Sequence, residues 1–172
     1  MPKLLVLVGG GDDEVMAVAE SIHEGARGVR FAESDLRRVA GEPGAGSVSR
    51  LRPLDEPEEL LAYDAIVLGG TADAAAHLSG LLQGAEPLGM AGRLANKLGS
   101  VFPQQDPATT GSGHPLWPLL APMARYGMIL VPPGYAGPDG APEDRAAAAR
   151  RLGRRLIDIA GWITHARSHH HH

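Results

Sequence analysis

The stretch KLLVLVGGGDDEV, residues 3–15, decides the fold of this chain. Its first half, Lys3–Val8, is an apolar run of the kind that forms a buried parallel strand, and three glycines end it abruptly. We expect a helix directly after the glycines, because Asp12 or Asp13 is placed to cap a first turn. Apolar residues then recur at helical spacing at Val15, Val18, Ala19, Ile22 and Ala26. A buried strand joined at once to an amphipathic helix predicts the α/β class.

The same alternation of strands and helices continues toward the end of the chain. Further strands are predicted at residues 29–32, 65–68, 98–102 and 128–131. Helices are predicted at residues 57–61, 74–82, 114–126 and 142–163, and the Gly-, Pro- and Ser-rich residues 40–53 are predicted to form a surface loop. Five strands alternating with helices predict a three-layer sandwich. Its five-stranded parallel sheet has the strand order 2-1-3-4-5.

Composition limits the class of protein. A chain of 172 residues fits one compact domain, expected over residues 1–166, because residues 167–172 (RSHHHH) have the composition of an expression tag. With 16 basic and 20 acidic residues, the chain is too acidic for non-specific nucleic-acid binding. It has no cysteine, which excludes disulfides, thiolate metal sites and a cysteine nucleophile. No apolar run approaches the roughly 18 residues of a membrane span. No signal peptide precedes the first strand, so we expect a cytoplasmic protein.

Three loops form the candidate binding site. In an open parallel sheet, ligands bind beyond the carboxyl ends of the strands, at the point where the strand order reverses. The candidate residues are Gly10, Gly11, Asp12, Asp13, Glu14 and Val15 in the first loop, Gly70, Thr71, Ala72 and Asp73 in the second, and Pro103, Gln104, Gln105 and Asp106 in the third. No side chain among them is assigned a catalytic role.

Several segments, taken in order, carry a resemblance to a known family. They include Leu4–Val8, Glu24-Gly25-Ala26, Tyr63–Ile66, Ser100-Val101-Phe102 and the run from Gly127 to Pro132. In order and spacing they resemble the WrbA family of NAD(P)H:quinone oxidoreductases. The resemblance implies a flavodoxin-like fold, bound FMN, reduction of quinones by NAD(P)H, and assembly into a homodimer or homotetramer.

The first loop departs from that family's pattern. The family has a serine near the start of the loop and a glycine closer to the helix, where this chain has Gly10 and Asp13. A helix N-terminus attracts each anionic charge by only about 0.3–1 kcal/mol. A carboxylate about 5 Å from one phosphate charge costs about 3 kcal/mol at an effective dielectric near 20. The sequence therefore predicts a WrbA-like protein in which FMN binding is weak or lost. Two alternatives stay open: a working FMN-dependent quinone reductase, and a flavin-free module that binds another ligand or a protein.

Two further charged groups have competing interpretations. The acids of the first loop could bind Mg²⁺, but capping of the following helix is the favoured interpretation. On the last predicted helix, four arginines lie opposite the apolar positions Leu152, Leu156, Ile159 and Ile163. These arginines are Arg150, Arg151, Arg154 and Arg155. We interpret them as a solvated face rather than as a patch for a phosphate or a partner.

Overall fold

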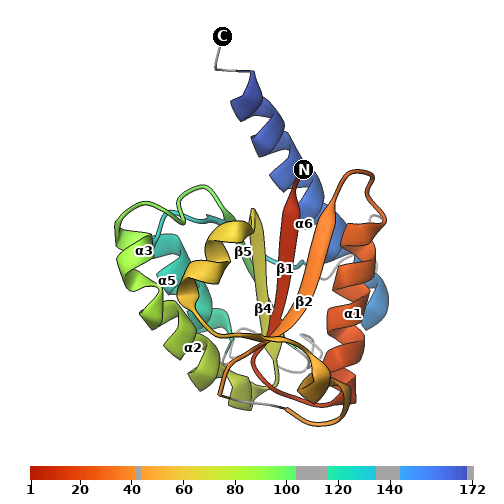
Figure 1. Cartoon of the computed structure of the whole chain (residues 1–172). Coiled ribbons are helices and arrows are strands. Elements are labelled where there is room, and N and C mark those ends of the chain that lie inside the picture. Colours follow the sequence, from red (N-terminus) through yellow and green to blue (C-terminus); the bar gives the residue numbers. More distant parts are fainter. Residues whose placement is uncertain (42–43, 104–115, 135–143, 170–172) are drawn as a thin grey trace.

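The computed structural model of the chain describes residues 1–41, 44–103, 116–134 and 144–169. In these residues a parallel sheet lies between two layers of helices (Figure 1). The strands are β1 (Lys3–Val8), β2 (Glu33–Val39), β3 (Pro53–Leu54), β4 (Ala65–Gly70), β5 (Leu98–Pro103) and β6 (Ile129–Leu130). The α-helices are α1 (Asp13–Arg27), α2 (Ala75–Gly84), α3 (Glu86–Met90), α5 (Leu120–Arg125) and α6 (Arg145–Ser168). The 3-10 helices are η1 (Gly46–Arg50), η2 (Pro57–Ala62), η3 (Ala72–Ala74) and η5 (Trp117–Leu119).

The strand order is β3-β2-β1-β4-β5-β6, and every pair is parallel. This confirms the α/β class and the parallel sheet. Without β3, the order β2-β1-β4-β5-β6 corresponds to the predicted order 2-1-3-4-5. The predicted number of strands is wrong by one. The additional strand β3 lies at the end of the segment that we expected to be a loop. It begins at Pro53, which suits the first position of an edge strand because proline has no N–H to donate, and it buries Leu54.

The second strand also lies elsewhere than predicted. We expected it at residues 29–32, whereas β2 covers Glu33–Val39. Charged residues hide the alternation of this strand, because some of them are buried and paired. Arg37 is 4% exposed and donates hydrogen bonds to the Pro53 carbonyl (2.8 Å) and to Glu59 Oε1 (2.7 Å). Asp35 accepts a hydrogen bond from the Tyr63 hydroxyl (2.6 Å).

The other predicted elements agree with the structure to within a few residues, whereas α3 and η1 were not predicted. The short predicted helix at 57–61 is η2, and the helix at 74–82 is α2. Of the predicted helix at 114–126, residues 114–115 lie outside the described residues, and η5 and α5 cover 117–125. The last helix begins at Arg145 and continues to Ser168, and residues 142–143 of its predicted range lie outside the described residues.

The core is divided by the sheet into two clusters of buried side chains. From β1, Leu5 and Leu7 contribute to the cluster that includes buried residues of α2 and α5. Leu4, Val6 and Val8 contribute to the cluster that includes buried residues of α1 and α6. Figure 1 shows these helix groups on opposite sides of the sheet. Because both faces of β1 are covered, the strand is continuously apolar rather than alternating.

Helix α6 packs closely against α1. Leu152 and Leu156 are buried as predicted, while Ile159 and Ile163 pack only partly buried at the edge of the core. Glycines allow the two backbones to approach: a Cβ atom at Gly153 would lie 1.9 Å from the carbonyl oxygen of Ile22. Among the described residues, no helix combines the length and the apolar character needed to cross a membrane.

Candidate functional site

The first two candidate loops meet at the carboxyl ends of β1 and β4. The Gly9 N–H donates a hydrogen bond to the Gly69 carbonyl (3.0 Å). Gly10 and Gly70 have φ angles of 124° and 139°, which favour glycine. A Cβ atom at Gly70 would lie 3.2 Å from the Gly10 carbonyl oxygen. The glycines therefore let the two loops lie backbone against backbone.

The third candidate loop follows directly from the same edge. Pro103 is the last residue of β5, and its backbone lies opposite Gly70 in the sheet register. The predicted site residues Gln104, Gln105 and Asp106 lie outside the described residues. The structure thus brings the first loop, the second loop and the start of the third to one edge of the sheet.

The N-terminus of α1 is capped by the chain itself. Asp12 is the N-cap residue, and its Oδ1 accepts hydrogen bonds from the N–H groups of Glu14 (3.0 Å) and Val15 (3.3 Å). These N–H groups belong to the unpaired donors at a helix start that bind phosphate in other proteins. The Asp12 carboxylate therefore already accepts hydrogen bonds from two of the N–H groups that an anionic ligand at this helix start would use.

Asp13 is held by a segment that we had predicted only as a surface loop. Its Oδ1 accepts hydrogen bonds from the N–H (3.0 Å) and the hydroxyl (2.6 Å) of Ser47 in η1. The hydroxyl hydrogen bond, followed by the backbone one, holds the pKa of Asp13 below its ordinary value. The Ala45 N–H also donates to the Gly11 carbonyl (2.7 Å). Residues 44–50 therefore dock against the first loop.

A signal for this docking is present in the sequence. Val48 is a large apolar residue within the Gly- and Ser-rich stretch that precedes β3, and it is completely buried against the α1 side of the sheet. Gly46 has a φ of 54°, and a Cβ atom there would lie 2.5 Å from Asp13 Oδ1. The valine between Ser47 and Ser49 thus marked a segment that packs onto the rest of the domain rather than one that extends into solvent.

The remaining predicted residues of the first two loops divide into core and surface. Val15 is fully buried and packs beneath Gly11, so it contributes to the core. Glu14 is exposed. In the second loop, Thr71 precedes η3, and Ala72 and Asp73 are exposed.

A metal site receives no support from the structure. Among the described residues, no group of three or more His, Asp or Glu side chains lies close enough together to hold a metal ion. The geometry instead agrees with the capping interpretation of the first-loop acids, since Asp12 caps α1 and Asp13 binds Ser47.

The arginines of α6 are not all solvated. Arg150 and Arg154 are exposed, as the solvated-face interpretation expects. Arg151 donates a hydrogen bond to the Gly134 carbonyl (2.8 Å), and Arg155 donates one to the Pro132 carbonyl (3.1 Å). Arg155 is exposed and agrees with that interpretation, whereas Arg151 is half-buried and departs from it. Both residues fasten the segment that follows β6 to the helix.

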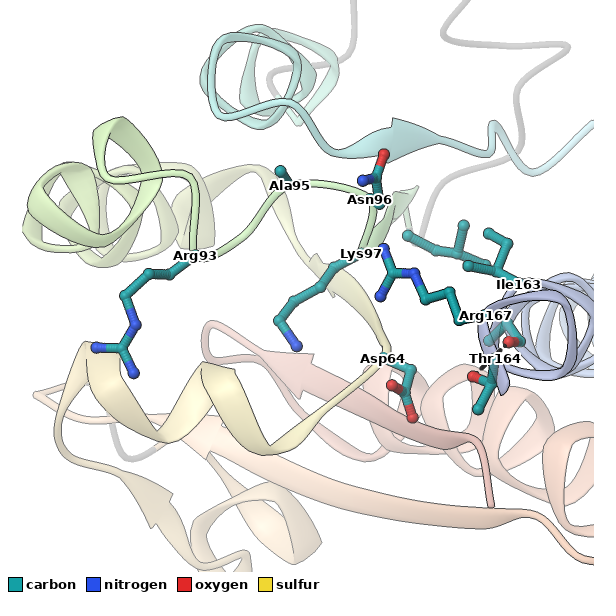
Figure 2. A pocket seen from close by; sticks show the side chains of 10 residues that line it. Asp64, Arg93, Ala95, Asn96, Lys97, Ile163, Thr164 and Arg167 are labelled. Atoms are coloured by element: carbon teal, nitrogen blue, oxygen red, sulfur yellow. Dashed lines mark hydrogen bonds between the residues drawn. The ribbon is translucent and has the colours of Figure 1, made fainter. Parts of the chain in front are cut away.

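A small polar hollow of about 110 Å³ lies at the opposite end of the sheet, near the starts of β4 and β5 (Figure 2). Asp64 and Lys97 line it, and Arg167 enters it from α6. The Lys97 ammonium donates hydrogen bonds to the carbonyls of Leu61 and Tyr63, and burial lowers the pKa of this lysine. The hollow therefore surrounds a lysine that already has partners, and part of its wall comes from the segment with the composition of a tag.

Comparison with known proteins places the fold. No family model matches the chain. The chain is similar to the flavodoxin-type, WrbA-like protein from Agrobacterium tumefaciens, with 16% identity, a TM-score of 0.64, and coverage of 94% of this chain and 99% of the other. It is similar to oxidised flavodoxin 1 from Bacillus cereus, with 16% identity, a TM-score of 0.57 and coverage of 91% and 97%. An oxidoreductase from Corynebacterium diphtheriae matches with 11% identity, a TM-score of 0.57 and coverage of 93% and 97%. At these identities the comparisons show that the chain has a flavodoxin-like α/β fold.

Proposed function

We propose that this chain is a WrbA-like protein of flavodoxin-like fold whose phosphate position is filled by its own side chains. FMN then binds weakly or not at all. One observation carries the proposal: the Asp12 carboxylate accepts hydrogen bonds from the N–H groups of Glu14 and Val15 at the start of α1.

Flavin binding requires that the Asp12 carboxylate be displaced, and this displacement costs free energy. For a phosphate to reach the helix N-terminus, Asp12 has to release two hydrogen bonds, and its charge stays nearby. One carboxylate about 5 Å from one phosphate charge costs about 3 kcal/mol at an effective dielectric near 20. This free energy corresponds to a dissociation constant for FMN that is larger by about two orders of magnitude.

A second obstacle is the segment that docks onto the loop. Asp13 binds Ser47, and Ala45 binds the Gly11 carbonyl, so residues 44–50 close over one side of the first loop. The described residues of this edge therefore do not fit the phosphate of FMN, and no step of quinone reduction is assigned to them. NAD(P)H and a quinone become relevant only if a flavin is bound.

The test is a titration of FMN fluorescence with the wild-type protein and with the double variant Asp12→Ser/Asp13→Gly. Serine keeps a capping hydroxyl at the helix start, so the variant retains its N-cap. The matched control is Glu20→Gln/Glu24→Gln, which removes two exposed charges from the same helix. We expect the double variant to bind FMN about 100-fold more tightly than wild type, with no such gain in the control.

Two results would contradict the proposal. One is a wild-type protein that is yellow as purified and holds one FMN per chain. The other is a double variant that folds normally and binds FMN no better than wild type, because the first loop would then not be the phosphate site.

A further inference from the structure

The chain has two lysines, Lys3 and Lys97, and their partners differ in charge. Lys3 lies among carboxylates: its Nζ is 3.5 Å from Asp35 Oδ2 and 3.9 Å from Glu33 Oε2. Lys97 is half-buried at the end of the sheet opposite the candidate loops, and it forms no ion pair within the described part of the chain. Because a nearby carboxylate favours the charged form of a lysine, the neutral amine is more accessible at Lys97 than at Lys3.

The neutral form of Lys97 keeps the hydrogen bonds that the side chain makes. Its Nζ donates to the carbonyls of Leu61 (3.3 Å) and Tyr63 (2.5 Å). An ammonium has three N–H groups, and the neutral amine has two N–H groups and a lone pair. Two N–H groups are sufficient for the two carbonyls, so loss of the third proton breaks neither hydrogen bond. Burial acts in the same direction, because it lowers the pKa of Lys97.

The polar hollow beside Lys97 has space for a small acyl group (Figure 2). Its volume is about 110 Å³, and a single water needs only about 10–15 Å³ of such space. Three other charged side chains line it: Asp64, whose charge raises the pKa of Lys97, Arg167, whose charge lowers it, and Arg93. Arg93 has no hydrogen bond or ion pair within the described part of the chain. Its positive charge favours an acyl donor with an anionic leaving group.

We propose that Lys97 is a covalent modification site that takes acyl groups from acyl phosphates. The lone pair of Nζ attacks the acyl carbon, a C–N bond forms, and the bond from that carbon to the phosphate oxygen breaks. Inorganic phosphate leaves with the bonding electrons, and the proton that Nζ loses passes to water. The site is at the opposite end of the sheet from Asp12, so the proposal is independent of flavin binding.

Acylation changes how β5 is tied to η2. The acylated nitrogen has one N–H, so either the Leu61 carbonyl or the Tyr63 carbonyl loses its donor. The helix η2 also carries Glu59, which binds the buried Arg37 of β2 (2.7 Å). We therefore expect acylation of Lys97 to lower the melting temperature by about 2–4 °C or more.

The test is acetylation of the folded protein by acetyl phosphate, with the rate at each lysine measured by mass spectrometry of peptides. The chain ending at Ala166 is used, so that Arg167 and the histidines after it cannot contribute. At pH 7 we expect Lys97 to react about threefold or more faster than Lys3, which corresponds to a pKa difference of about half a unit. The rate at Lys97 should also level off at a lower pH. In urea the two rates should become similar, because both lysines are then solvated.

A pair of variants tests the role of the hollow. Thr164→Phe places a ring at an exposed position that lines the hollow, and it should slow the reaction of Lys97 without changing that of Lys3. The matched control is Arg154→Phe, which adds a ring on the same helix away from the hollow and should leave both rates unchanged. The melting temperature is compared between acetylated Lys3→Arg, modified at Lys97 and the N-terminus, and acetylated Lys3→Arg/Lys97→Arg, modified at the N-terminus alone.

Four results would overturn the proposal. They are a rate at Lys97 no higher than that at Lys3 in the folded chain, the same ratio of rates in urea, an unchanged rate at Lys97 in Thr164→Phe, and a melting temperature that does not respond to acetylation of Lys97. The first three contradict a reactive amine that is created by the fold. The last contradicts the coupling of this amine to η2.

Discussion

Replacing Glu59 with glutamine tests how β2 is held to the rest of the fold. The Glu59 carboxylate accepts hydrogen bonds from the N–H groups of Asp55 (2.8 Å) and Glu56 (3.0 Å), and from Arg37 Nη2 (2.7 Å). The Glu56 N–H and the Arg37 guanidinium, in that order, lower the pKa of Glu59 from 4.5 to about 2. Arg37 itself is 4% exposed, so its charge depends on this carboxylate.

The magnitude follows from that pKa shift. A shift from 4.5 to about 2 corresponds to at most about 3.4 kcal/mol. The Glu59 side chain is 36% exposed, so solvent screening reduces the expected contribution to about 1–2 kcal/mol. Because the folded-state pKa is the lower one, folding favours the ionised carboxylate. The stabilisation is complete above pH 4.5 and is lost as the pH falls toward 2.

The assay is urea unfolding, followed by circular dichroism between pH 7 and pH 2. Glu59→Gln should be less stable than wild type by about 1–2 kcal/mol at pH 7, and this difference should shrink toward zero by pH 2. Glu58→Gln changes the exposed neighbour in the same 3-10 helix and should unfold like wild type throughout. A stability difference between wild type and Glu59→Gln that stays constant across this pH range would refute the reasoning.

Three other predictions follow from single residues. Gly153→Ala should lower the melting temperature, with a cost of about 3 kcal/mol or more, because its Cβ would lie 1.9 Å from the Ile22 carbonyl oxygen. Gly161→Ala on the same helix should be neutral or stabilising, since among the described residues its Cβ would meet Pro2 Cγ at 3.7 Å and no nearer atom. Ser100→Ala should raise the free energy of unfolding by about 1 kcal/mol, because the buried Ser100 hydroxyl has no hydrogen-bond partner among the residues that the structure describes. A loss of stability in urea unfolding would contradict this. His23 should titrate below pH 6.5 in NMR spectra, because burial lowers its pKa, and folding stability should fall as the pH drops through that titration.

The strands that were predicted well are those buried on both faces. For β1 and β4, the apolar run and the glycines that end it were sufficient, because a strand covered on two sides contains few polar residues. The sequence placed β2 wrongly because Arg37 and Asp35 find partners from η2 and Tyr63, far away in the chain. Pairing between residues so far apart in the sequence leaves no local pattern, so these charged residues resemble surface residues in the sequence.

The candidate site was likewise predicted in part, with its loops placed correctly and its long-range contacts missed. The three loops were placed by strand order alone, and the structure brings the described parts of them to one edge of the sheet. The contact between Asp13 and Ser47 was missed. Ser47 is separated from Asp13 by a whole helix and strand, and only the fold brings them within hydrogen-bonding distance.

The sequence by itself determined the α/β class, the parallel order of the central strands and a helix cap at Asp12 or Asp13, because periodicity and capping act over a few neighbouring residues. Only the tertiary structure decided which charges are buried, how residues 44–50 close over the first loop, and that Phe31 and Trp162 remain exposed. Those features depend on which distant segments come into contact. Such contacts are settled by packing over the whole chain rather than by local preference.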